Sequence, residues 1–117
     1  MKHRVNQLLI PPPRRNIDTN TYLLDSLNLF CKSRFNATIR TTSRQVRPIL
    51  FYCLAEIGIE KKWLYTRLGV GRSYFYRDIK DGEFMATKTP SGRRLYVEIQ
   101  SFLVQNLAER LKNRTNL

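Results

Sequence analysis

The sequence predicts a mainly α-helical protein with one small β-hairpin. Apolar residues spaced three and four apart lie on both sides of the break Gly69-Val70-Gly71, which indicates a helix, a tight turn and a second helix. Two short β-prone runs farther on are separated by Pro90-Ser91-Gly92, which is typical of a hairpin. A last apolar stripe, over Val97 to Asn113, predicts a C-terminal helix. Together these features predict a winged helix-turn-helix with an added N-terminal helix and a C-terminal helix.

The charge of the chain indicates a polyanionic partner. A length of 117 residues corresponds to one domain with a modest core. The 21 Lys and Arg against 9 Asp and Glu give a net charge of +12, which favours nucleic acid. The cations are also unevenly placed, because residues 61–94 hold nine of them against three acidic residues. They concentrate where the helix-turn-helix and the hairpin are expected.

Membrane and zinc-finger classes are not favoured. No stretch approaches the roughly 18 apolar residues of a spanning helix. The run Leu8-Leu9-Ile10 is too short for a signal peptide. We therefore expect a cytoplasmic protein that associates with the nucleoid through DNA and has no membrane partner. Cys31 and Cys53 lack CxxC spacing and His3 is the only histidine, so both thiols are expected to be buried packing groups.

Residues 1–47 are expected to form an arm and an accessory element. Residues 1–17 contain three consecutive prolines followed by Arg14-Arg15, and a basic arm along DNA and a flexible terminus both remain open. Residues 18–47 are expected to hold a helix at Thr21 to Phe30 and then a polar loop. That helix would cover the core or form a dimer contact, and covering is favoured because a small core gains from it.

Residues 48–113 are expected to form the main domain. Pro48 fits the first turn of a helix with a wide apolar face, which Gly58 would end. The final helix would cover the domain, and its part from Leu107 onward leaves self-association open. Residues 114–117 are expected to be a flexible end.

The second helix of the helix-turn-helix is expected to read DNA. Phe75 and Ile79 point into the core at i and i+4, and Phe84 is expected to hold the hairpin there. The outer edge is cationic and hydrogen-bonding, which suits a major groove; it consists of Arg72, Ser73, Tyr74, Arg77 and Lys80. The expected wing contacts to the backbone or minor groove are Lys88, Ser91, Arg93 and Arg94. The expected phosphate contacts of the preceding helix are Lys61, Lys62 and Arg67.

A longer pattern resembles a known family over about residues 58–108. Its residues are Gly69, Arg72-Ser73, Phe75-Tyr76-Arg77, Ile79-Lys80, Gly82, Phe84, Gly92-Arg93-Arg94, Glu98-Ile99 and Phe102-Leu103. This order resembles the AlpA-type regulators and excisionases, small winged-helix proteins of phages and mobile elements whose DNA-binding fold is similar to that of MerR regulators. The chain departs from that pattern at Tyr65 and Met85. The resemblance implies transcription regulation or excision (a recombination directionality factor), cooperative self-association on DNA and a recombinase partner.

No catalytic arrangement is predicted. The single histidine lies near the start of the chain, and Asp78, Asp81 and Glu83 fall where Asp81-Gly82 predicts a turn. We therefore expect no enzyme activity, metal, cofactor or small-molecule substrate. Two alternatives to DNA binding remain. One is a basic RNA-binding module that stacks bases on Tyr74, Tyr76 and Trp63; the other is an adaptor that binds a recombinase or another protein through its terminal helices.

Overall fold

The structure is a computed structural model that describes residues 17–115, with side chains described for residues 19–108. Its elements are α1 (Ile17–Phe35), the short 3-10 helix η2 (Ile39–Thr41), α2 (Arg47–Glu56), α3 (Lys61–Leu68), α4 (Arg72–Lys88) and α5 (Pro90–Thr115). No strand occurs among the described residues, so the predicted β-hairpin and winged fold class are wrong. The expected arm at the N-terminus lies outside the described residues except for its last position.

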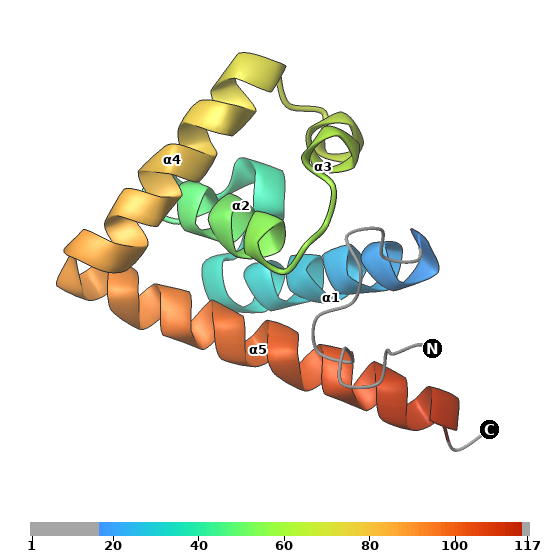
Figure 1. Cartoon of the computed structure of the whole chain (residues 1–117). Helices are drawn as coiled ribbons and strands as arrows, with labels where there is room; N and C mark the ends of the chain where they lie inside the picture. Colours follow the sequence, from blue (N-terminus) through green and yellow to red (C-terminus); the bar gives the residue numbers. More distant parts are fainter. Residues whose placement is uncertain (1–16, 116–117) are drawn as a thin grey trace.

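The helices surround one apolar core. In Figure 1, α1 and α5 run alongside each other, α2 lies above them, and α4 crosses α2 before meeting the start of α5 at a sharp corner. α3 is seen end-on beside the start of α4, so the axes of these two helices cross. The largest fully buried side chains come from all five α-helices and from η2, and include Leu23, Leu27, Ile39, Ile49, Leu50, Phe51, Leu54, Leu64, Phe75, Ile99 and Leu103.

The corner between α4 and α5 replaces the predicted hairpin. Thr89 has extended angles (φ −115°, ψ 140°), because a residue before proline avoids helical angles. Pro90 then occupies the first position of α5, where its missing N–H is not needed. The Thr89 hydroxyl accepts a hydrogen bond from the Gly92 N–H at 3.1 Å, which is an N-cap. Pro90-Ser91-Gly92 is therefore the start of a helix, and the residues expected in the hairpin belong to α4 and α5.

Gly82 lies inside α4 and not at the turn predicted for Asp81-Gly82. The residue is buried, and a Cβ added there would collide with the carbonyl oxygen of Pro48 and stand 2.9 Å from Tyr52 Cβ. Pro48 and Tyr52 belong to α2, so the two helices cross in backbone contact at this point. Glycine is needed here for the close approach, because any side chain would separate the helices.

A largely buried ion pair joins the same two helices. Arg47 Nε lies 3.2 Å from Asp78 Oδ2, and the Asp78 side chain is only 3% exposed. Asp78 stands four residues before Gly82 and thus on the same side of α4. Arg47 Nη1 also donates to the carbonyl oxygen of Arg40 at 3.5 Å. The guanidinium therefore connects α2, α4 and the segment around η2.

The accessory helix covers the core, which is the alternative that the sequence favoured. Leu23, Leu27 and Cys31 are fully buried, and the Phe30 ring packs on Phe102 of α5 at 4.8 Å between centroids. α1 extends beyond the expected Thr21 to Phe30 at both ends, and its last turn bears Arg34, whose Nε lies 2.9 Å from Glu98 Oε2. The expected loop of residues 32–47 is thus partly helical.

One position expected in the core is exposed. Phe84 is 59% exposed. The sequence placed Phe84 in the core as part of a hairpin, but in a continuous α4 its position faces outward. The burial of Cys31 and Cys53 as free thiols is confirmed.

Replacing Gly82 with alanine is expected to lower the free energy of unfolding by about 3 kcal/mol, because the new methyl meets backbone that cannot rotate away. Urea denaturation followed by circular dichroism measures it. Gly71→Ala is the matched control: its Cβ would lie 3.6 Å from Tyr74 Cδ2, so the loss of this N-cap glycine should cost below about 1 kcal/mol. Equal small losses in both variants would contradict the backbone contact.

Replacing Arg47 with methionine is expected to cost roughly 3 kcal/mol of unfolding free energy, because the Asp78 carboxylate stays buried without its cation. The control is Arg34→Met, which breaks the exposed pair with Glu98 and should leave the urea midpoint nearly unchanged. A comparable shift in the two variants would show that the Arg47–Asp78 pair contributes no more than a surface pair.

Candidate nucleic-acid interface on helix α4

The turn between α3 and α4 is built by two glycines. Gly69 adopts left-handed angles (φ 69°, ψ 33°), which glycine reaches without the strain of a side chain. Its N–H donates to the Thr66 carbonyl oxygen at 3.2 Å, and the Val70 N–H donates to that of Tyr65 at 3.1 Å. These bonds end α3, and Gly71 is the N-cap of α4. The three-residue turn and the start of α4 stand where the sequence predicted them, whereas α4 continues past the predicted end at Asp81-Gly82 to Lys88.

The inner edge of α4 fixes its orientation against the core. Phe75 and Ile79 are buried, as predicted from their spacing. The Phe75 ring lies 5.0 Å from that of Phe51 in α2 and 5.8 Å from that of Tyr65 in α3, measured between centroids. α4 is therefore held by aromatic contacts to both neighbours, and its opposite face is set toward solvent.

That opposite face carries a continuous stripe, which we call the outer stripe. Its members follow at steps of four, three, four and four residues, which keeps them on one side of a helix. All five are exposed: Ser73, Arg77, Lys80, Phe84 and Lys88. The stripe runs for about 22 Å at 1.5 Å per residue. It contains three cations and no acidic residue.

Of the five residues predicted to read DNA, three belong to the outer stripe and two flank it. Arg72 and Tyr74 are exposed beside the stripe, and Tyr74 is 61% exposed. The Arg77 guanidinium lies 5.2 Å from the centroid of the Tyr74 ring. This stacking favours one orientation of a long side chain that would otherwise sample many. The hydrogen-bond donors of these side chains therefore project from a helix whose orientation is fixed by the core.

No acidic residue of α4 belongs to the outer stripe, although Asp81 lies one turn after Arg77 and Glu83 lies three residues after Lys80. Asp78 is buried and paired with Arg47, and Asp81 is half-buried. Glu83 is exposed, but it lies on the flank, one residue before Phe84 in a helix that turns 100° per residue. The outer stripe itself therefore carries three cations and no carboxylate, and the two carboxylates that are not buried lie on its flanks.

Further cations bracket α4 at its two ends. On α3, the helix that precedes α4, lie the predicted phosphate contacts, namely Lys61, Lys62 and Arg67, all exposed. At its end lie the residues expected in the wing: Lys88 closes α4, and Ser91, Arg93 and Arg94 are exposed in the first turns of α5 (Figure 1). None of these cations forms an ion pair with a carboxylate among the described residues. The residues predicted in a wing thus lie at a corner between two helices, and the prediction of a wing is wrong. They nevertheless remain close to the end of α4.

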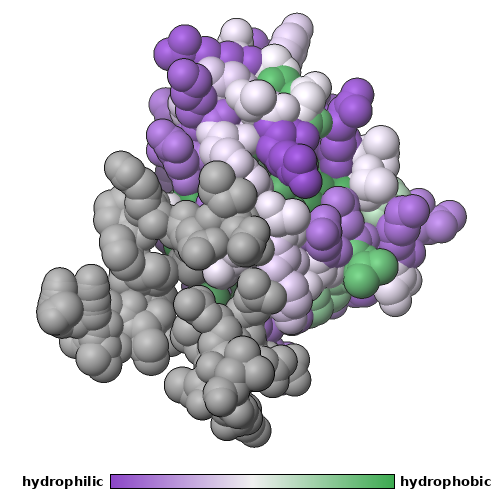
Figure 2. Space-filling model, turned by 90° about the vertical axis from the view of Figure 1, so that its right-hand side faces the viewer, coloured by the Kyte–Doolittle hydropathy of each residue, from purple (hydrophilic) through white to green (hydrophobic). Residues whose placement is uncertain are grey.

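The surface on the α3 side of the molecule is mostly polar where α3 and the beginning of α4 lie. Figure 2 views the molecule from the right-hand side of Figure 1, where α3 and the beginning of α4 lie in the upper part. Hydrophilic side chains dominate that upper part, and the hydrophobic patches between them are small. The described residues in this upper part form no broad apolar area.

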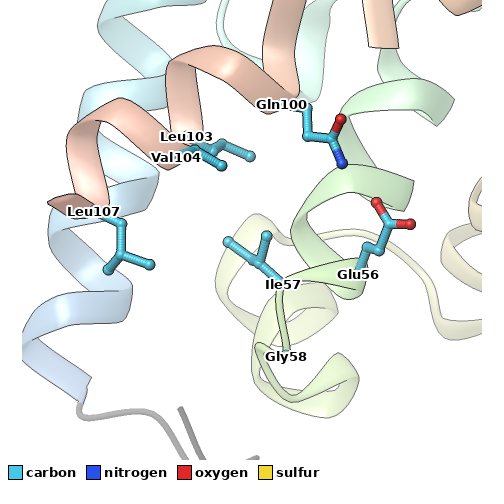
Figure 3. A pocket seen from close by; sticks show the side chains of 7 residues that line it. All are labelled: Glu56, Ile57, Gly58, Gln100, Leu103, Val104 and Leu107. Atoms are coloured by element: carbon cyan, nitrogen blue, oxygen red, sulfur yellow. The ribbon is translucent and has the colours of Figure 1, made fainter. Parts of the chain in front are cut away.

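A second feature is an apolar pocket of about 280 Å³ between the end of α2 and the middle of α5. Ile57, Leu103 and Leu107 point toward its space, and Glu56 stands at one end (Figure 3). The Glu56 carboxylate accepts hydrogen bonds from the hydroxyls of Tyr96 at 2.6 Å and Tyr52 at 3.3 Å. Burial, and then Glu56, raise the pKa of both tyrosines. The one carboxylate at the pocket is thus committed to a structural network.

Nucleophilic and metal chemistry find no support in the described part of the chain. Burial raises the pKa of the Cys31 thiol to about 11, and that of Cys53 even further. Both thiols are uncharged at neutral pH, whereas a reactive cysteine is a thiolate. Among the described residues, no group of three His, Cys, Asp or Glu side chains converges as metal ligands would.

Sequence reasoning misplaced two members of the outer stripe and missed one ion pair. It assigned Phe84 to the core, placed Lys88 in a wing, and gave no role to the pair of Arg47 with Asp78. A signal for the first two was present: Arg77, Lys80, Phe84 and Lys88 keep helical spacing once α4 is continued through Gly82. Thr89-Pro90 is also a typical helix start. The ion pair spans two helices and leaves no local signal.

No protein-family model, curated protein or solved structure matches this chain. The resemblance to AlpA-type regulators therefore gains no support from these comparisons. No helix within residues 17–115 combines the length and apolar character that crossing a membrane requires.

Proposed function

We propose that this protein binds double-stranded DNA sequence-specifically, with α4 in the major groove. The observation that carries the proposal is the outer stripe of α4. It is cationic, exposed and free of carboxylates, and it lies opposite an edge that aromatic contacts fix to the core. A B-DNA major groove is about 12 Å wide and admits one α-helix. The second helix of a helix-turn-helix is the element that usually enters it.

The side chains of α4 would share the contacts by chemistry. Arg77 and Lys80, in the middle of the stripe, are suited to the O6 and N7 acceptors of guanine. The Ser73 hydroxyl can donate to or accept from a base edge, and Arg72 and Tyr74 flank the groove. These contacts would supply sequence information, whereas contacts to phosphates would set position and register.

Phosphate contacts would come from both ends of α4. Lys61, Lys62 and Arg67 on α3 would bind the backbone beside the start of the helix. Arg93 and Arg94, in the first turns of α5, would bind it beside the other end. Cations at both ends of a helix about 25 Å long fit a helix that lies along the groove between its two backbone walls.

The biological role rests on the sequence resemblance and is part of the same proposal. It would be the regulation of transcription, or the direction of a recombinase toward excision, in a phage or mobile element. One helix reads only a few base pairs, so useful specificity would require neighbouring copies on repeated sites. Adaptor function toward a recombinase is compatible with this arrangement, because α1 and the later part of α5 lie away from α4 (Figure 1).

A second candidate, single-stranded RNA binding, has one observation in its favour: Tyr74 and Tyr76 are exposed on α4 and could stack bases. However, the Tyr74 ring already stacks with Arg77, and the Tyr76 ring packs edge-on against Phe75. The duplex therefore remains the favoured ligand.

The first test is selection of binders from a random duplex library at about 150 mM salt, where non-specific attraction is weak. A short enriched motif is expected, repeated in tandem if copies bind side by side. Single-stranded RNA is included as competitor. Absence of enrichment together with stronger competition by RNA than by duplex would reject the proposal in favour of the second candidate.

Replacing Arg77 with alanine is expected to weaken binding to the selected motif by about 5- to 150-fold, because the variant cannot form the bidentate hydrogen bonds to a base. Binding to random duplex should fall far less. Fluorescence anisotropy with both duplexes measures the two affinities, and Arg34→Ala, on α1, is the matched control. An equal loss on both duplexes would show that Arg77 contacts only phosphate.

Removing the cations at either end of α4 should change the salt dependence. Two double variants, Lys61→Gln with Lys62→Gln and Arg93→Gln with Arg94→Gln, are each expected to reduce the slope of log K against log salt. The reduction is about 0.9 for each phosphate that the variant no longer neutralises, and it should be similar on motif and random duplex. Lys32→Gln, on α1, serves as control. An unchanged slope in the second variant would place the start of α5 off the DNA.

A further inference from the structure

Phe84 is an apolar side chain in the middle of a cationic stripe. It is 59% exposed, and its neighbours one turn away along the stripe are Lys80 and Lys88. Single exposed apolar residues are common on protein surfaces and require no explanation by themselves. What distinguishes Phe84 is its position, because it lies on the same line as Arg77 and Lys80, the two cations best placed to read bases.

The register of Phe84 fits a helix that contacts bases along its length. Arg77, Lys80 and Phe84 are spaced i, i+3 and i+7, which is the spacing of base-contacting positions on a recognition helix that lies along the major groove. The rise from Arg77 to Phe84 is about 10 Å. At about 3.4 Å per base pair, this corresponds to roughly three base pairs. Phe84 would therefore reach a different base pair from Arg77.

The chemistry of the groove narrows what an aromatic ring can recognise there. The major-groove edges of guanine, cytosine and adenine present hydrogen-bonding groups, whereas thymine adds a C5-methyl group. A phenyl ring has no donor or acceptor, and it would leave such polar groups desolvated and unpaired. Against the thymine methyl group the phenyl ring leaves no polar group unpaired, and it buries apolar surface. Insertion between base steps is a minor-groove device and does not fit this placement of α4.

We propose that Phe84 reads a thymine methyl group, about three base pairs from the position contacted by Arg77. This inference rests on the proposed DNA binding and adds a specificity-determining residue to it. It assigns a role to the C-terminal half of α4. Because α4 continues through Gly82, Phe84 belongs to the outer stripe.

The test replaces single thymines of the selected motif with deoxyuridine, which lacks only the methyl group. Affinities are measured by fluorescence anisotropy for the wild-type chain and for Phe84→Ala. At one thymine the wild type should bind about three- to fivefold less tightly to the deoxyuridine duplex, the effect of one buried methyl. Phe84→Ala should bind the two duplexes equally at that position and keep any discrimination at the others.

Two controls separate this contact from general effects. Val104→Ala removes a comparably exposed apolar side chain from α5 and should retain the discrimination. Phe84→Leu keeps an apolar side chain and should retain part of it. Because Phe84 is exposed, its alanine variant should melt within a few degrees of the wild type, which circular dichroism checks.

The outcomes distinguish this inference from the proposal beneath it. An enriched motif in which no thymine can be told from deoxyuridine would overturn the role of Phe84 and leave DNA binding intact. The same holds if, at every position, Phe84→Ala loses the same factor in affinity for the thymine duplex and for the deoxyuridine duplex. The discrimination between the two would then persist without Phe84. A chain that enriches no duplex motif would overturn both.

Discussion

The close crossing of α2 and α4 is the constraint on which the rest of the structure depends. At Gly82 no side chain separates α4 from the Pro48 carbonyl of α2, and one turn earlier Asp78 is buried against Arg47. The two contacts have different consequences. The glycine sets how near the helices come, and the ion pair sets how α4 is rotated, because a buried carboxylate must face its cation.

The rotation of α4 decides what the protein presents to solvent. With Phe75, Asp78 and Gly82 turned toward the core, helical geometry leaves Arg77, Lys80 and Phe84 on the other side. Burial of Asp78 also removes a negative charge from the surface of a helix that would approach phosphates. Thus one packing arrangement both fixes the orientation of α4 and leaves its outer stripe cationic. A groove-binding helix needs these two properties.

The corner at Thr89-Pro90 has an equally physical origin. Proline disfavours helical angles for the residue before it, so α4 stops there, while its ring favours the first turn of a new helix. The Thr89 hydroxyl caps that turn, and Gly92 permits the close return of the chain, since a Cβ there would collide with the Met85 carbonyl oxygen. The chain turns at this corner without forming a strand. Arg93 and Arg94 therefore lie in the first turns of α5, next to the C-terminal end of α4.

These local rules explain how far the sequence alone could go. The spacing of Leu23, Leu27 and Cys31 correctly placed a covering helix, and the break at Gly69 correctly separated α3 from α4. The cationic edge at Arg72 and Arg77 was also visible, because exposed charge opposite an apolar edge is a local pattern. Such features depend only on residues within a few turns of one another, and the sequence determines them.

The length of α4 and the identity of its outer stripe were decided by tertiary structure. Asp81-Gly82 carries a turn signal, and only the presence of α2 opposite Gly82 shows that the glycine serves a helix crossing instead. Once the helix continues, Phe84 moves from an expected core position to the surface, and the expected hairpin becomes a corner. The physical reason is that the burial of a small residue such as Gly82 depends on both segments that meet there. The sequence around Gly82 does not show that α2 packs against it.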